Sequence, residues 1–230
     1  MEPGIVQDVR AALAQALNDP ANLKGSRLAT PAVRAISREI FAQVRKDDKT
    51  RTFELCEVLL SSCTWEERTI AFDWAYRCRK LFAETDFARF EGWLRDYVTG
   101  WGSCDDFCAH AFGRLIYQYP ATLPQAMPWT ASPNRWFKRA SAVVLIYGIR
   151  RDAFFDAAFQ TADALLTDND DMVQKGYGWM LKEVSKRTPM PVFNYVMAHK
   201  RTMPRTALRY AIEKLEPSLR EQAMRRDWKN

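Results

Sequence analysis

Hydrophobic and polar residues alternate along most of this 230-residue chain with the spacing of amphipathic helices. The nine glycines are scattered, which argues against a sheet with many tight turns. Helix-start signals precede several apolar segments: Thr30 before Pro31, Thr64 three residues before Glu67, and Ser132 before Pro133. The pattern therefore predicts an all-α chain of about a dozen helices.

Further amphipathic helices are predicted at 86–98, 152–166, 171–187, 191–200, 204–215 and 217–226. The longest nearly apolar run, 140–149, is far shorter than the roughly 20 residues that a bilayer requires. The N-terminus shows no basic leader followed by an apolar segment. We therefore expect a cytoplasmic protein without a membrane span.

Three of the predicted helices share a pattern, in segments 65–77, 136–148 and 172–184. In each, a basic residue is followed three positions later by a small one, which lets neighbouring helices approach while the charged side chain reaches outward. The matched pairs are Arg68 with Ala71, Arg139 with Ala142, and Lys175 with Gly178. The segments are separated by about one or two periods of 35 residues, a spacing typical of stacked helical hairpins. The repeat predicts a single domain over 1–230, a curved right-handed solenoid of HEAT-like repeats.

The formal charge of +6 is spread over many helices, which fits either solvated helix faces or a basic surface for a polyanion such as nucleic acid. Five cysteines, an odd number, indicate free thiols. Cys104, Cys108 and His110 lie close in sequence, but no second Cys or His cluster completes four metal ligands. The chain has two histidines and no phosphate-binding glycine loop, so the sequence gives no support to nucleotide hydrolysis or hydride transfer. We expect neither a metal nor a cofactor.

The stretch WGSCDDFCAH, residues 101–110, places two adjacent aspartates after a tryptophan. Helix capping is one interpretation, with Ser103 as the N-cap and Asp106 at the third helical position, where a carboxylate complements the helix dipole. A chemical role for one of the carboxylates is the alternative, and the rest of the chain bears on it.

Five ordered motifs resemble the AlkD family of DNA alkylation repair glycosylases over nearly the whole chain. They are GSRLATPAVRAISREI at 25–40, TWEER at 64–68, WGSCD at 101–105, NRWFKRA at 134–140 and VQKGYGWMLKE at 173–183. The resemblance implies a monofunctional enzyme of base excision repair that hydrolyses the N-glycosidic bond of cationic N3- or N7-alkylated purines. It also implies contact with the lesion through sugar and phosphate, without an enclosing base pocket.

Carried over by motif, the resemblance makes Asp105 the catalytic carboxylate, and Trp101 and Trp179 the aromatic residues beside the lesion. Arg139 matches an arginine near the DNA backbone, and Lys175 and Arg68 are expected to hold phosphates. A fixed carboxylate stabilises the positive charge that develops on the sugar as the base departs. We expect a monomer that binds duplex DNA with alkylated bases.

Other interpretations stay open at each position. Trp101 and Trp179 fit packing positions, Arg139 fits an ion pair, and Arg68 and Lys175 fit braces between hairpins. Gly102 replaces an acidic residue common in the family, and segment 19–29 lacks an aromatic residue found near the lesion in some members. A non-catalytic binder of damaged DNA and a protein-binding scaffold are the alternative functions. We expect Trp65, Trp74, Trp93 and Trp136 in the core.

Overall fold

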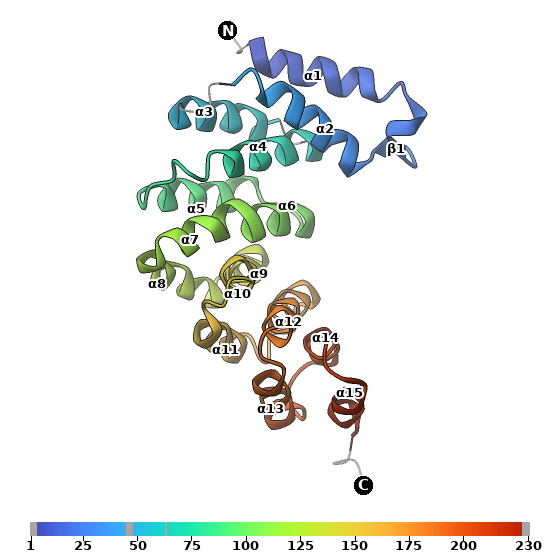
Figure 1. Cartoon of the computed structure of the whole chain (residues 1–230), viewed down its shortest axis with the longest axis vertical. Coiled ribbons are helices and arrows are strands. Elements are labelled where there is room, and N and C mark those ends of the chain that lie inside the picture. Colours follow the sequence, from blue (N-terminus) through green and yellow to red (C-terminus); the bar gives the residue numbers. More distant parts are fainter. Residues whose placement is uncertain (1–3, 45–47, 63, 227–230) are drawn as a thin grey trace. The chain divides into compact units, whose positions relative to one another are not determined.

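The computed structural model describes residues 4–44, 48–62 and 64–226, which form two compact units, Met1–Tyr97 and Val98–Asn230. Helices make up most of the described part of both units and the described strands are two short ones, so the all-α prediction is confirmed (Figure 1). The curvature of the array, its handedness and its organisation as a single domain stay predictions. Cys63 lies outside the described residues.

The first unit contains one short hairpin and five helices within its described part. They are α1 (Gly4–Ala16), the 3-10 turn η1 (Pro20–Asn22), β1 (Leu23–Lys24), β2 (Arg27–Leu28), α2 (Thr30–Phe41), α3 (Lys49–Leu60), α4 (Trp65–Arg77) and α5 (Asp86–Tyr97). The strands are antiparallel, with Leu23 opposite Leu28. Gly25, at the turn, has φ +67°, a backbone conformation that glycine adopts without strain.

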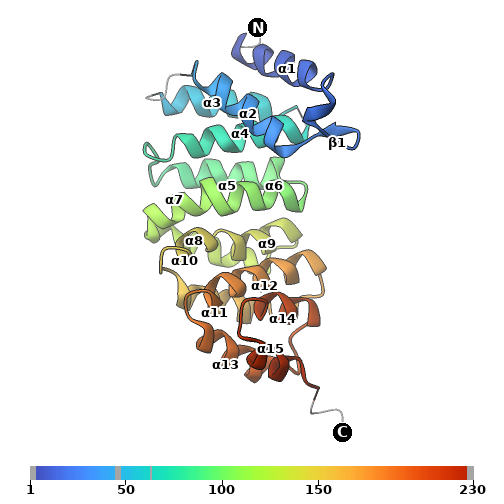
Figure 2. The same ribbon diagram turned by 45° about the vertical axis from the view of Figure 1, so that its right-hand side comes forward.

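The second unit begins with a continuous helical segment, in which α6 (Trp101–Asp106) runs through the π-helical turn η2 (Phe107–Phe112) into α7 (Gly113–Gln118). Its next elements are η3 (Pro120–Thr122), α8 (Leu123–Ala126), η4 (Met127–Ala131), α9 (Arg135–Val143), α10 (Ile146–Ile149) and α11 (Phe155–Ala164). The last four are α12 (Asp171–Ser185), α13 (Pro189–His199), α14 (Arg205–Ala211) and α15 (Pro217–Met224). Helices α9, α12 and α14 pack in succession, as Figure 2 shows.

Local capping explains several of these boundaries. Thr64 accepts a hydrogen bond from the Glu67 amide (3.3 Å), as predicted for the start of α4. Helix α9 begins later than predicted because Asn134, rather than Ser132, is its N-cap and accepts from the Trp136 amide (2.9 Å). The N-cap position of α2 is Ala29, one residue before the expected Thr30.

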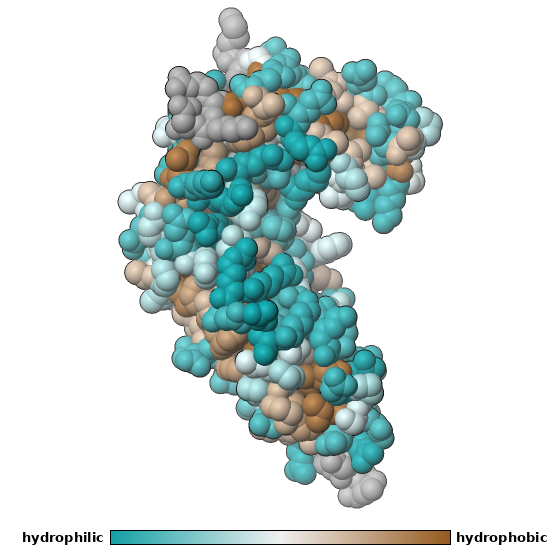
Figure 3. All heavy atoms as spheres, viewed as in Figure 1, coloured by the Kyte–Doolittle hydropathy of each residue, from teal (hydrophilic) through white to brown (hydrophobic). Residues whose placement is uncertain are grey.

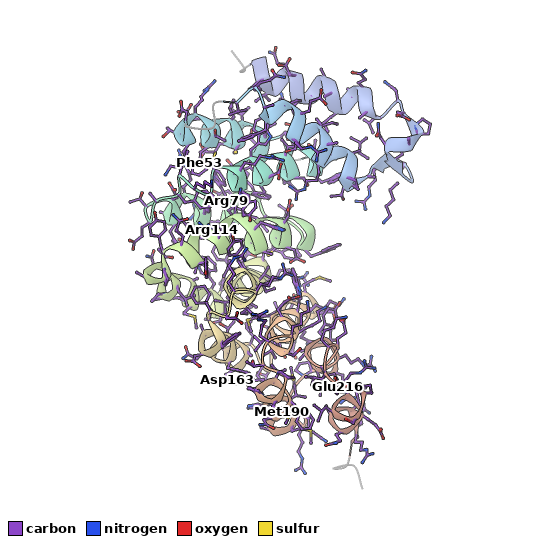
Figure 4. The ribbon with its side chains drawn as sticks, viewed as in Figure 1. Phe53, Arg79, Arg114, Asp163, Met190 and Glu216 are labelled. Atoms are coloured by element: carbon purple, nitrogen blue, oxygen red, sulfur yellow. The ribbon has the colours of Figure 1, made fainter. Side chains whose placement is uncertain are left out.

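The core of the first unit is aromatic. Phe53, which Figure 4 labels on α3, is fully buried and lies 5.5 Å from the Phe90 ring and 5.4 Å from the Trp93 ring. The core prediction is confirmed for Trp74 and Trp93, which are buried, and wrong for Trp65 and Trp136, which are half-buried. Arginine side chains lie over the half-buried rings, Arg27 over Trp65 and Arg135 over Trp136. In both cases the indole is a helix-surface residue covered by a cation.

Ion pairs about one repeat apart connect helices within each unit. They are Arg34 with Asp73 and Lys49 with Asp86 in the first unit, and Lys138 with Asp168, Arg150 with Glu183 and Lys182 with Glu213 in the second. Another side-chain contact joins α13 to α11, where Tyr195 donates a hydrogen bond to Asp163 (2.9 Å), labelled in Figure 4. Side-chain contacts about one repeat apart therefore link neighbouring helices within each unit.

Candidate nucleic-acid site

A hollow of about 390 Å³ opens in the second unit, between helices α6, α9, α12 and α14. It is lined by Trp101, Asp105, Arg139, Met172, Lys175, Trp179, Lys182 and Tyr210. Five of the six site residues that were predicted from the sequence therefore line this one hollow. The sixth, Arg68, lies half-buried on α4 of the first unit, and its contact with DNA stays a prediction.

The start of α6 differs from the capping that the sequence predicted. The helix begins at Trp101, with Gly100 as N-cap in an extended conformation. Ser103 is the third helical residue, and its hydroxyl accepts from the Gly100 amide (3.3 Å). Asp106 is the last residue of α6, and its carbonyl oxygen lies 2.9 Å from Nδ1 of His110. The predicted N-cap role of Ser103 and the predicted position of Asp106 in the first turn are both wrong.

This earlier start places Trp101 and Asp105 one helical turn apart on α6. Trp101 is the first residue of the helix and its indole is 62% exposed, so its aromatic surface is available to a ligand. The Asp105 side chain is 20% exposed. Behind it, the Cys104 thiol is buried and lies 3.7 Å from the Trp136 carbonyl oxygen. Helix α6 thus holds a carboxylate beside an exposed aromatic ring.

Arg139 holds both oxygens of Asp105. Its Nε donates to Oδ1 and its Nη2 to Oδ2, each at 2.8 Å, and its Nη1 donates to the carbonyl oxygen of Met172. The Arg139 side chain is only 6% exposed. The absence of a Cβ on Gly176 leaves room for it, because a Cβ there would lie 3.0 Å from Cγ of Arg139. Arg139 therefore forms an ion pair with Asp105, which was the alternative interpretation of this residue in the sequence. Its contact with a DNA phosphate stays a prediction.

The electrostatics of this pair favour its charged form. Burial acts to lower the pKa of Arg139, but the hydrogen bonds and negative charge of Asp105 outweigh that effect and raise it from its ordinary value. The bidentate geometry also fixes the plane of the carboxylate. Asp105 is thus an oriented acceptor with lone pairs left for a further ligand.

The opposite side of the hollow belongs to α12 and α14. Lys175, Trp179 and Lys182 follow one another at helical spacing, so they share a face of α12. Lys175 pairs with Asp171 (2.6 Å) and Lys182 with Glu213 (3.1 Å), partners that are about half exposed. Exposed pairs of this kind are weak and exchange readily for another anion. Lys175 braces no neighbouring hairpin through this contact, since Asp171 lies on its own helix.

Tyr210 and Lys182 are lining residues that sequence reasoning missed. Tyr210 reaches the hollow because α14 packs closely on Gly178, where a Cβ would lie only 2.7 Å from the Tyr210 Cβ. The Lys182 ammonium lies 5.6 Å from the centre of the Tyr210 ring. The small residue Gly178 predicted that a neighbouring helix packs closely on α12. It did not predict which residue of that helix makes the contact. Tyr210 adds a third aromatic side chain to the hollow.

The cysteines of the described residues raise the question of reactive thiols and of a metal site. Cys56, Cys78, Cys104 and Cys108 are free and buried, and burial raises the pKa of Cys108 well above its ordinary value. Thiols held in this state are poor nucleophiles. Among residues 4–44, 48–62 and 64–226, no group of three or more His, Cys, Asp or Glu side chains is arranged to hold a metal ion. Within the same ranges, no helix has the length and hydrophobicity of a membrane span.

Hydrophilic residues cover much of the visible face of each unit (Figure 3). The lining of the hollow combines three cations with one carboxylate, so it is net positive. Such a lining attracts an anionic ligand, and its aromatic side chains add planar surfaces. The arrangement can hold a phosphorylated, ring-containing ligand with one oriented carboxylate facing it.

Comparison with known structures identified a protein described as a predicted DNA alkylation repair enzyme from Enterococcus faecalis. The match has a TM-score of 0.72 and 17% sequence identity, and it covers 94% of this chain and 97% of that protein. At this identity the match establishes a shared fold. A comparison with curated proteins found no match.

The family model described as DNA alkylation repair enzyme matches residues 23–215, most of the chain. The matched range includes every residue of the hollow. The protein therefore belongs to the DNA alkylation repair enzyme family.

Proposed function

We propose that this protein is an AlkD-like monofunctional DNA glycosylase that hydrolyses the N-glycosidic bond of cationic N3- or N7-alkylated purines in duplex DNA. The observation that carries the proposal is the Asp105 carboxylate, held by both oxygens and facing a hollow with Trp101 and Trp179 in its lining. Family membership supports a role in alkylation repair. We further propose that it acts in the cytoplasm, in base excision repair.

The reaction requires little of the protein because the alkylated base already carries a positive charge. When the bond between the base and C1′ of the sugar breaks, its electron pair goes to the base, which leaves neutral. The sugar becomes oxocarbenium-like and takes up the oxygen of water, which loses a proton. A fixed carboxylate stabilises that positive charge and accepts a hydrogen bond from the water. Asp105 supplies this group.

The remaining polar residues of the lining are suited to bind the phosphates on either side of the alkylated nucleotide. Lys175 and Lys182 are paired only with exposed carboxylates, so a phosphodiester can replace those partners. Tyr210 lines the hollow beside Lys182, whose ammonium lies over its ring. Tyrosine hydroxyls are among the groups that bind phosphate oxygens in DNA complexes. These contacts position a strand without reading its sequence.

Base release from methylated duplex DNA tests the proposal. Wild-type protein should release N3-methyladenine and N7-methylguanine and leave neutral modified bases in place. Asp105→Asn should lower the single-turnover rate by roughly 10- to 10⁴-fold, with DNA affinity retained. Asp106→Asn, a charge-matched change on the same helix outside the hollow, is the control. Thermal unfolding must accompany both, because Asp105→Asn leaves the buried Arg139 without its charged partner.

The outcome separates the candidate functions. No release by wild-type protein that still binds DNA would make this a non-catalytic binder of damaged DNA. Preference for an acidic protein partner over duplex DNA would instead indicate a scaffold. Equal release by wild type and Asp105→Asn would remove Asp105 from the chemistry.

Arg139→Ala distinguishes the two roles of the arginine. If Arg139 holds only Asp105, base release should fall much as in Asp105→Asn, with an unchanged dependence of DNA affinity on salt. If it also contacts a phosphate, the salt slope should decrease by about one. The three engaged nitrogens favour the first result.

A further inference from the structure

A cluster of charged side chains around the buried Glu183, outside the lining of the hollow, contacts Trp179. Its indole Nε1 donates a hydrogen bond to Oε1 of Glu183, one helical turn along α12, at 3.1 Å. The Glu183 side chain is 4% exposed, although glutamate is rarely buried without a partner. Trp179, which lines the hollow, is thus hydrogen-bonded to a carboxylate that lies outside the lining.

Two cations keep this carboxylate in place. Arg150 donates from Nε to Oε2 at 3.1 Å, and Lys186 donates from Nζ to Oε1 at 2.8 Å. Both side chains are more than 40% exposed, so each keeps much of its hydration while it pairs with Glu183. The carboxylate is therefore the one member of the cluster that depends wholly on its protein partners.

Arg150 also contacts the indole directly. Its guanidinium carbon lies 6.0 Å from the centre of the Trp179 ring, within cation–π range. Arg150 does not line the hollow, whereas Trp179 does. The indole is thus fixed by its N–H and by Arg150 while part of its surface stays available to a ligand.

We propose that Glu183 is a positioning residue, which sets the orientation of Trp179 as a wall of the hollow through its hydrogen bond to the indole and its hold on Arg150. The catalytic consequence rests on the proposed glycosylase function, but the orientation itself does not. The hydrogen bond restricts rotation of the indole about its side-chain torsions, and the Glu183–Arg150 pair holds the guanidinium near the ring. Without Glu183, neither restraint remains.

Fluorine NMR of protein that contains 5-fluorotryptophan tests the orientation, with the Trp179 signal assigned by its loss in Trp179→Phe. In Glu183→Ala, the Trp179 resonance should shift and broaden while the other tryptophan resonances stay in place. In Glu183→Gln, which keeps an acceptor oxygen, it should stay near its wild-type position. An unmoved Trp179 resonance in Glu183→Ala would overturn the proposal, whether or not the protein releases any base.

Single-turnover base release at saturating protein tests the consequence. Glu183→Ala should slow release on the order of tenfold, the equivalent of one hydrogen bond to a charged group, and Glu183→Gln by less. In a Trp179→Phe background, Glu183→Ala should have no further effect, because the residue that it positions is gone. Independent losses that multiply in the double variant would contradict the positioning role.

A matched control comes from the first unit, where Glu57 accepts a hydrogen bond from the indole of Trp93 (3.0 Å). Glu57→Ala should perturb the Trp93 resonance and leave base release unchanged. If wild-type protein releases no base, the proposed function fails, and the spectra of the Glu183 variants still decide whether Glu183 orients Trp179. If Glu183→Ala does not fold, Glu183→Met, which fills the side-chain volume and removes the acceptor oxygens, carries the same comparison.

Discussion

The two units contain the same grouping of indole, carboxylate and arginine, with opposite burial. In the first unit, Trp93 donates to Glu57 and Arg89 pairs with Glu57, each at 3.0 Å. There the indole is 3% exposed and the carboxylate side chain 35% exposed. In the second unit, the carboxylate of Glu183 is buried and the indole of Trp179 is half-buried.

This inversion shows what each hydrogen bond does. A buried indole N–H needs an acceptor, and Glu57 supplies one from the surface at little cost to itself. Trp179 is half-buried and lines the hollow, so part of its ring is accessible while its N–H is bonded to Glu183. In the second unit the buried member is the carboxylate and the accessible member is the ring, which is the arrangement that the proposed positioning role of Glu183 requires.

Truncating a tryptophan should give the largest difference between the units. Trp93→Ala should cost about 3–5 kcal/mol of unfolding free energy, because it leaves a cavity in the aromatic core. Trp101→Ala should stay within about 0.5 kcal/mol of wild type, since the ring is largely exposed. Chemical denaturation of both variants measures this. Similar losses would mean that Trp101 also supports the fold.

Removing the charge of Glu183 should have the next largest effect. Burial acts to raise the pKa of Glu183, yet hydrogen bonds from Arg150 and Lys186 and the charge of Arg150 lower it from 4.5 to about 2. A depressed pKa stabilises the folded state above the unfolded value, and that stability is lost as the pH falls through the folded value. Glu183→Gln should therefore be less stable by about 2–3 kcal/mol at pH 7.

The pH dependence supplies the check on that prediction. Urea unfolding between pH 7 and pH 2 should show the two proteins converging below about pH 4.5, the ordinary value for the carboxyl. A difference that stays constant across this range would show that the glutamine disturbs packing, and that the charge of Glu183 contributes little.

Adding a methyl group at two helix glycines should give effects of opposite sign. Gly178→Ala should destabilise by about 1–3 kcal/mol, because its Cβ would lie 2.7 Å from the Tyr210 Cβ and 2.9 Å from the Ala207 carbonyl oxygen. Gly92→Ala in α5 should stabilise by about 0.5–1 kcal/mol, since only the Arg95 guanidinium lies within 4 Å and alanine favours the helix. Thermal unfolding distinguishes them, and a neutral Gly178→Ala would mean that α14 can move away from α12.

Much of the fold follows from sequence periodicity. The apolar spacing and caps predict α4, α5, α12 and α15 to within a few residues of their observed bounds. Asp105 and Arg139 are 34 residues apart, about one repeat, so stacked hairpins bring them together. The start of α6 was not predictable in this way, because Gly100 caps it through an extended backbone instead of a side chain.

Contacts between helices limited the prediction of the site. Trp65, Trp74, Trp93 and Trp136 occupy similar positions in amphipathic patterns, and only the packed structure separates the buried pair from the half-buried pair. Tyr210 lines the hollow through the packing of α14 on α12, and Glu183 contacts Trp179 from outside the lining, where Arg150 also meets α12. Gly178 signals a close approach to α12 but not which residue makes it, and the contact of Arg150 has no local sequence signal.

The π-helical turn between α6 and α7 makes the effect of a deletion in this segment depend on its position. A π-helical turn holds an extra residue compared with an α-helical one, and each residue rotates the helix by about 100°. Deleting one residue between Phe107 and Phe112 would restore α-helical winding and keep the helix in phase on both sides, whereas a deletion between Trp101 and Asp105 would turn Trp101 by about 100° away from the face of Asp105. A single-residue deletion should therefore be tolerated in the π-helical turn, and should disable the site while leaving a folded chain when it falls between Trp101 and Asp105.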